Sequence, residues 1–282
     1  MKENNMQIKR SALIAMLMLL LVGYASAQSN YEEWITKSFD CLEKEDLKGA
    51  EACLREAMTL EPANPINFAL LSNLGTLQRR QGKLQEALLS YSAALSLNPN
   101  NTAMLENRAS LYAELGEDEK AMSDYNALLI LEPQRQEALY ARGLLYLQKR
   151  NYVEAENDFD KLLTLNDNSV QARMGFALME KLRGNYTESE RIYNYLLTEM
   201  PRYWKLYEDR AELYFLMGKN ARAMNDINKV FYESKPTASH YVLRGKIKLA
   251  QYERERAIQD FDKAKEMGYS AEVIDELLEM TK

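Results

Sequence analysis

The stretch QEALYARGLLYLQKRNYVEAENDFDKLLTLND, residues 136–167, carries the pattern that decides the fold. Leu139, Gly143 and Tyr146 lie three to four residues apart and form one apolar face of a helix. A second set with the same spacing follows a break at residues 150–152. Neither helix can bury its apolar face alone, so we expect the unit to pack against copies of itself.

The pattern recurs seven times along the chain. The first interval between copies is 37 residues and the other five are 34 residues. We place the repeats at residues 31–67, 68–101, 102–135, 136–169, 170–203, 204–237 and 238–269. A fixed period of this length is typical of an array of helical hairpins, and it fixes the fold class as all-α.

Two places in the repeat hold only small residues, and a third holds bulky ones. The eighth place holds Ser38, Gly75, Ala109, Gly143, Ala177, Ala211 and Gly245. The twentieth place holds Ala50, Ala87, Ala121, Ala155, Ser189, Ala223 and Ala257. Four residues later stand Leu54, Tyr91, Tyr125, Phe159, Tyr193, Ile227 and Phe261. Small side chains let two helices cross closely, since larger ones overpack such a contact at a cost of about 1 to 3 kcal/mol.

The turns follow the same register. The fifteenth place holds Gly82, Gly116, Gly184 and Gly218, where the first helix has to end. The thirty-second place holds Pro62, Pro99, Pro133 and Pro201, which stop the second helix.

A 34-residue helical hairpin with these small, aromatic and proline positions resembles the tetratricopeptide repeat, and Trp34 stands at the fourth place, where that family often has tryptophan. The resemblance implies a right-handed superhelical solenoid of helix-turn-helix repeats. Residues 270–282, SAEVIDELLEMTK, are expected to add a C-terminal capping helix. We expect Ser270 to cap this helix, with Val273, Leu277 and Leu278 covering the last repeat.

Four repeats have an arginine at the seventh place and an aspartate at the twenty-third, and the other three have neither. The pairs are Arg108 with Asp124, Arg142 with Asp158, Arg210 with Asp226, and Arg244 with Asp260. This correlation predicts structural ion pairs between first and second helices, within a repeat or across to a neighbour, instead of an anion-binding row.

The composition supports a folded chain and argues against nucleic acid as a partner. Hydrophobic residues make up 46% and charged residues 28%, and the formal net charge is −6. Nucleic-acid binding needs a cluster of lysine and arginine, which this acidic chain lacks.

The N-terminus resembles an export signal. Lys9 and Arg10 precede the apolar residues 12–22, and the small residues 25–27 precede Gln28. We expect residues 1–27 to be a signal peptide cleaved between Ala27 and Gln28, which places the protein in the periplasm or makes it secreted. The alternative, a membrane anchor, is less favoured because a spanning helix needs about 20 apolar residues. The mature chain is therefore expected to have no transmembrane segment.

Residues suited to chemistry are few. His240 stands near the start of a first helix, where we expect it at the surface and without a catalytic role. Cys41 and Cys53 both belong to the first repeat, and they form either a disulfide in an oxidising compartment or two buried thiols. No cofactor or metal motif is present, so we predict that the protein is not an enzyme and that it has no cofactor and no metal site.

In the family, first helices line the concave surface and present side chains at the second, fifth, ninth and twelfth places. The resemblance therefore implies a groove in repeats four to six formed by Tyr140, Leu144, Leu147, Met174, Leu178, Lys181, Lys205, Glu208, Glu212 and Phe215, with Ile35, Phe39 and Leu42 in repeat one. These residues either form a contact surface or pack under the neighbouring helix.

One family variant grips a C-terminal carboxylate with lysine, asparagine and arginine at set places. Asn107 matches one of them, but Ser72, Thr76, Glu137 and Ala141 occupy the surrounding places, so we do not expect that clamp.

The sequence therefore predicts a non-catalytic scaffold that binds a protein or peptide segment in its groove outside the cytoplasm. The alternative is a structural assembly factor of an envelope complex that acts through self-association or contacts with a membrane complex. The identity of the partner and the oligomeric state are not specified by the sequence.

Overall fold

A computed structural model describes residues 30–281, and every regular element within this range is a helix. The expected signal peptide and its cleavage site lie outside the described residues. The chain forms two compact units divided between Ala138 and Leu139, each of which is described by itself. The predicted all-helical repeat fold is confirmed.

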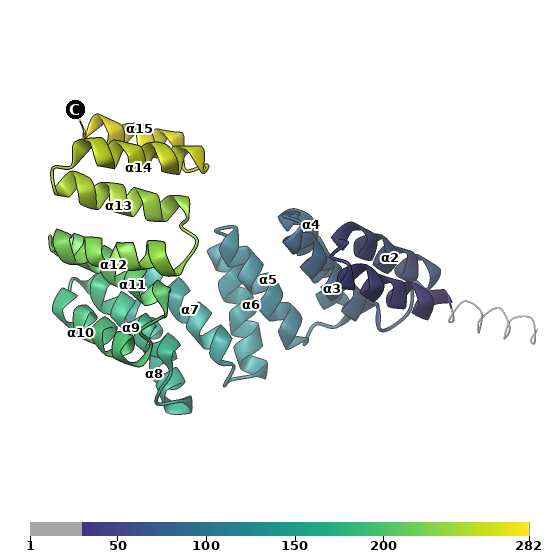
Figure 1. Ribbon diagram of the computed structural model, residues 1–282. Helices are drawn as coiled ribbons and strands as arrows, with labels where there is room; N and C mark the ends of the chain where they lie inside the picture. Colours follow the sequence, from purple (N-terminus) through teal and green to yellow (C-terminus); the bar gives the residue numbers. More distant parts are fainter. Residues whose placement is uncertain (1–29, 282) are drawn as a thin grey trace, which may run out of the picture. The chain divides into compact units, whose positions relative to one another are not determined.

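The first unit starts with a helix over residues 30–43. It continues with α2 (Leu47–Leu60), α3 (Asn67–Arg80), α4 (Leu84–Leu97), α5 (Thr102–Glu114), α6 (Asp118–Leu131) and the first residues of α7 (Gln136–Gln148). From α2 to α6 each helix packs against the next one in the chain (Figure 1).

The second unit contains the rest of α7 and eight further helices of the described chain. They are α8 (Tyr152–Leu165), α9 (Val170–Arg183), α10 (Tyr186–Glu199), α11 (Trp204–Leu216), α12 (Asn220–Glu233), α13 (Ala238–Ala250), α14 (Arg254–Glu266) and α15 (Ala271–Glu279). Consecutive helices from α8 to α15 lie side by side, and α11 also contacts α13, so first helices of adjacent repeats are neighbours (Figure 1).

The small and bulky positions form the core of each helical pair. The residue at the twentieth place is completely buried in all seven repeats, and the bulky residue four places later is at most 4% exposed. Close approach explains the small residues: a Cβ added at Gly143 would lie 2.5 Å from Cε1 of Phe159. The residue pattern therefore acts through packing between the first and second helix of each repeat.

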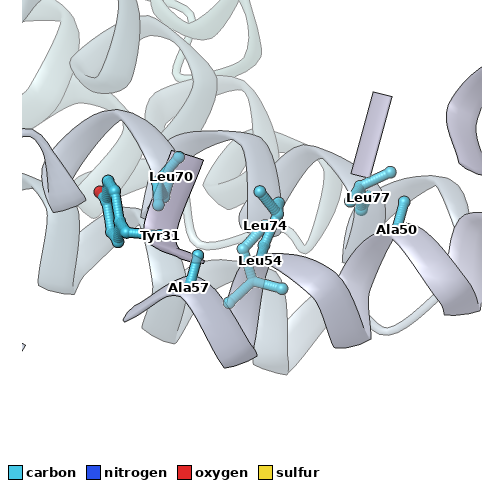
Figure 2. Close-up of a cluster of buried hydrophobic side chains, with 7 residues drawn as sticks. All are labelled: Tyr31, Ala50, Leu54, Ala57, Leu70, Leu74 and Leu77. Carbon is cyan, nitrogen blue, oxygen red and sulfur yellow. The ribbon is translucent and has the colours of Figure 1, made fainter. Parts of the chain in front are cut away.

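The first repeat shows how three helices share one core. Tyr31, Leu54, Leu70 and Leu74 belong to a buried cluster between the helix over residues 30–43, α2 and α3 (Figure 2). Cys53 is buried, whereas Cys41 is partly buried. Both are free thiols in the structure. Burial raises the pKa of Cys53, and the neighbouring Cys41 raises it further.

The fifteenth place has the left-handed backbone conformation in every repeat. Gly184 adopts it at the C-cap of α9 with φ of 84°. Glu45, Arg150 and Tyr252 adopt it without being glycine, with φ of 58°, 56° and 65°. The turn geometry is thus common to all repeats, although the glycine is not.

The C-terminal helix covers the last repeat differently from the expectation. Ile274 and Leu277 are buried against α14, whereas Val273 is 37% exposed. Leu278 packs partly against the same cluster. Ser270 is the N-cap residue of α15, but its side chain makes no capping hydrogen bond, so this part of the prediction was wrong.

Candidate binding face

The arginines and aspartates that the sequence links are adjacent in the structure, and each pair lies within one repeat. Arg108 donates to Asp124 from Nε at 2.7 Å and from Nη2 at 2.8 Å. The other three pairs have the same two-bond geometry, in Arg142 with Asp158, Arg210 with Asp226 and Arg244 with Asp260. The aspartate side chains are at most 8% exposed. Hydrogen bonding to Asp124 raises the pKa of Arg108 above its ordinary value. These arginines are therefore structural.

In the second unit the first helices of the repeats are α7, α9, α11 and α13. They share one face, which we call the first-helix face. Lys181 of α9 donates to Glu212 of α11 at 2.7 Å. Nε2 of His240 in α13 lies 3.3 Å from Glu208 of α11. These contacts join three consecutive first helices.

A charged cluster lies on α11 at the centre of this face. Lys205 contacts Glu208 at 2.6 Å and Asp209 at 3.4 Å. Burial raises the pKa of Asp209 above its ordinary value, although Lys205 and Lys181 act in the opposite direction. The family positions did not include Asp209, whose neighbours in the sequence, Glu208 and Lys205, were the available signal.

Two tyrosines lie close to this cluster. Burial raises the pKa of Tyr140 to about 12, and the nearby Asp209 adds to the effect. Tyr193, which is 1% exposed, has a pKa raised well above its ordinary value by burial, with further contributions from Asp209 and Glu212. The ring of Tyr140 packs against Phe159 with centroids 6.3 Å apart. Tyr140 is thus largely a packing residue that remains partly exposed.

The structure separates the predicted groove residues into three groups. Leu144, Met174, Leu178 and Phe215 are partly exposed and available for contact. Lys181, Glu208 and Glu212 are already ion-paired, and the side chain of Lys181 is only 8% exposed. Leu147 is 2% exposed, so it is a core residue, and its assignment to the groove was wrong.

The three residues assigned to the groove in the first unit also differ in exposure. Phe39 is 53% exposed. Ile35 and Leu42 are partly buried and pack against the core cluster of the first repeat. Only Phe39 therefore presents a largely free side chain there.

His240 was expected at the surface, but it is 3% exposed. Its Nδ1 accepts a hydrogen bond from the backbone N–H of Thr237 at 3.0 Å, which stabilises the start of α13. The other ring nitrogen faces Glu208, and the ring packs edge-on against Trp204. His240 is therefore a buried helix-capping residue.

Residues 30–281 contain no group of three or more histidine, cysteine, aspartate or glutamate side chains arranged to hold a metal ion. No helix in the same range has the length and apolar character required to cross a membrane.

The arrangement defines a class of protein, an array of helical hairpins whose first helices share a face. Tetratricopeptide repeat family models match residues 68–101, 102–135 and 136–169. A crystal structure of a tetratricopeptide repeat protein from Parabacteroides merdae is 67% identical over 90% of this chain and 99% of that chain, with a TM-score of 0.84. The chain belongs to the tetratricopeptide repeat family.

More distant structures share the fold. PilW, a type IV pilus biogenesis factor, is 20% identical over 74% of this chain and 98% of its own, with a TM-score of 0.61. MamA from Desulfovibrio magneticus is 16% identical over 60% of this chain and 94% of its own, with a TM-score of 0.55. Curated protein sequences contain no match to the chain. The family fold is that of a protein-interaction scaffold, which is typically non-catalytic.

Proposed function

We propose that the protein is a non-catalytic scaffold that binds a segment of another protein on the first-helix face of the second unit. The observation that carries this proposal is the combination of Leu144, Leu178 and Phe215, all partly exposed, with a charged cluster that is already paired internally. A face built in this way has its polar groups satisfied before a partner arrives. Binding then needs little reorganisation and gains chiefly from covering apolar side chains.

Charged substitutions on the apolar part of the face test this proposal. We expect L144E combined with L178E to abolish capture of the partner, because two carboxylates would be buried without counter-charges on binding. The matched control is V153E combined with Y232E, which adds the same charge at side chains that are 64% and 84% exposed on second helices.

The measurement is crosslinking of the chain in its native compartment, followed by affinity purification and quantitative mass spectrometry. Partners of the first-helix face should disappear with L144E/L178E and remain with the control. Equal recovery with both variants, at unchanged circular dichroism, would dismiss the face as the binding site. It would favour the alternative in which other surfaces mediate assembly of an envelope complex.

We also propose that the chain is exported and cleaved between Ala27 and Gln28. The support is the order of basic, apolar and small residues at the N-terminus. Mass spectrometry of the exported fraction should find a mature chain that starts at Gln28. Replacing Ala25 and Ala27 by bulky residues should leave the uncleaved chain, and an uncleaved wild-type chain in the cytoplasm would contradict the proposal.

A further inference from the structure

The fifth repeat is the only one in the second unit that lacks the arginine–aspartate pair. Phe176 of α9 and Ile192 of α10 occupy the two places that Arg210 and Asp226 occupy in the following repeat. Both side chains are partly exposed. Phe176 packs edge-on against Phe159, with ring centroids 5.7 Å apart. The groove between α9 and α10 therefore has an apolar floor where the other three repeats of the second unit have two partly buried hydrogen bonds between charged groups.

An open cavity of about 490 Å³ lies over this floor. We call it the repeat-five pocket, and it is lined by Arg173, Phe176, Glu180, Glu188, Arg191, Ile192 and Tyr195. An α-helix advances about 100° per residue, so Phe176 and Glu180 lie on the side of α9 opposite to Leu178. The pocket is therefore separate from the first-helix face.

Most charged groups around the pocket are already paired. Glu188 accepts two hydrogen bonds from Arg191, at 2.8 Å from Nε and 2.6 Å from Nη2. Glu180 accepts from Asn185 at 2.6 Å and from Arg183 at 3.1 Å. Both carboxylates are thus satisfied within the second unit.

Arg173 differs from these groups. Its Nη1 donates to the backbone oxygen of Asp167 at 2.8 Å, and its guanidinium lies 5.2 Å from the ring centroid of Tyr195. It makes no ion pair with a carboxylate of residues 30–281. The pocket consequently joins an apolar floor to one guanidinium that makes no ion pair, in a lining that also holds the paired Glu180 and Glu188.

We propose that the repeat-five pocket binds a segment of a partner protein in which a bulky apolar side chain lies next to a glutamate or aspartate. The apolar side chain packs on the ring of Phe176 and on the aliphatic side chain of Ile192. The adjacent carboxylate pairs with Arg173, whose remaining N–H groups can donate in the forked geometry that carboxylates accept. Glu180 and Glu188 at the rim repel any additional acid, so the segment carries a single carboxylate, at the position of Arg173.

The probe is a fluorescent peptide, acetylated and amidated at its ends, with a central phenylalanine followed by glutamate and otherwise serine residues. The matched peptide has glutamine in place of glutamate. Binding to the full mature chain is measured by fluorescence anisotropy. We expect the glutamate peptide to bind about tenfold or more tightly than the glutamine peptide, as for loss of one hydrogen bond to a charged group.

Three variants locate the peptide. R173Q should weaken binding of the glutamate peptide about tenfold and remove the difference between the two peptides. R191Q, at the same rim but on an arginine paired with Glu188, should change affinity by less than about twofold. F176R combined with I192D rebuilds the ion pair found in the other three repeats of the second unit and fills the floor, so the chain should fold and lose binding of both peptides.

L144E/L178E should leave peptide affinity unchanged, which distinguishes this pocket from the first-helix face. Equal affinity of the two peptides, or an unchanged affinity in R173Q, overturns the proposal. Concentration-dependent self-association that R173Q abolishes, seen by analytical ultracentrifugation, would identify a second copy of the chain as the occupant and would also overturn it.

Discussion

At the scale of single residues, the arginine at the seventh place joins more than its own aspartate. Nη1 of Arg108 donates to Ser92 at 3.1 Å, and Nη1 of Arg210 donates to Asn194 at 2.7 Å. Ser92 and Asn194 both belong to the second helix of the preceding repeat. Arg108 and Arg210 therefore each connect three helices. This explains why a long, partly exposed side chain stands at this place.

We predict that Arg210 and Asp226 are strongly coupled. Removing either partner leaves a polar group buried beside an apolar core, so R210A or D226A alone should lower the free energy of unfolding by about 2 to 4 kcal/mol. The double variant should cost less than the sum by about 1 to 3 kcal/mol. Urea unfolding followed by circular dichroism supplies the four values.

The control for this cycle is the exposed pair Lys263 and Glu266, whose side chains are 49% and 67% exposed. Its coupling should be below about 0.5 kcal/mol. If the coupling of Arg210 with Asp226 is as small, the ion pair is incidental to the fold.

Glu51 gives the first unit a pH-dependent contact. Burial alone would raise its pKa, but hydrogen bonds from Lys83, Arg55 and Gln81 outweigh burial and lower the pKa to about 2. Because the folded-state pKa is below the ordinary value of 4.5, the stabilisation is complete above that value and is lost as the pH falls toward 2. E51Q should therefore lose less stability than the wild type between these two pH values, as measured by thermal unfolding. Parallel pH profiles of the two chains would show that Glu51 contributes nothing.

At the scale of elements, the turn after each first helix imposes one backbone conformation at seven positions, four of which are glycine. The left-handed region costs a residue with a Cβ about 1 to 2 kcal/mol, whereas glycine enters it freely. Tyr252 bears this cost at a position where its side chain is 90% exposed. The repeat geometry therefore overrides the local preference of the chain at this turn.

Y252G should accordingly stabilise the second unit by about 0.5 to 1 kcal/mol, after allowing for the greater flexibility of glycine in the unfolded chain. Y252A is the matched control, because it removes the same exposed ring but keeps the Cβ. It should give no gain. The midpoint of urea unfolding distinguishes the two variants, and equal midpoints would mean that the turn is not strained.

The elements were more predictable than the site. Small and bulky residues at fixed places specify how two helices cross, and this information is local to each hairpin. The burial of His240 depends instead on Trp204 and Glu208 of the preceding repeat, which spacing within one repeat does not encode. His240 also stands where the usual capping pattern has glutamate or glutamine. The sequence therefore did not indicate that its side chain accepts a hydrogen bond from the backbone of Thr237. Asp209 was missed because its importance comes from burial beside Lys205.

At the scale of the whole molecule, each helix of the second unit from α9 onward packs against its neighbours in the chain, and α11 also shares a core with α13 of the next repeat. Stability in such an array is the sum of the repeats and of the contacts between adjacent ones. Within residues 30–281 the last repeat is followed by α15, which buries Ile274 and Leu277 against α14. The ion pair between Lys265 and Asp275 at 2.7 Å is exposed and adds little.

A chain that ends at Tyr269 should therefore lose protection in α13 and α14 while α2 to α6 stay protected. Burial of one large aliphatic side chain is worth about 1.5 to 3 kcal/mol, so exposure of the face under Ile274 and Leu277 should speed amide exchange in α14 by about tenfold or more. Hydrogen exchange followed by mass spectrometry resolves the two regions. M280A, at a side chain that is 68% exposed, should leave exchange unchanged. Unaltered exchange of α14 in the shortened chain would mean that the last repeat is stable by itself and that α15 is not its cap.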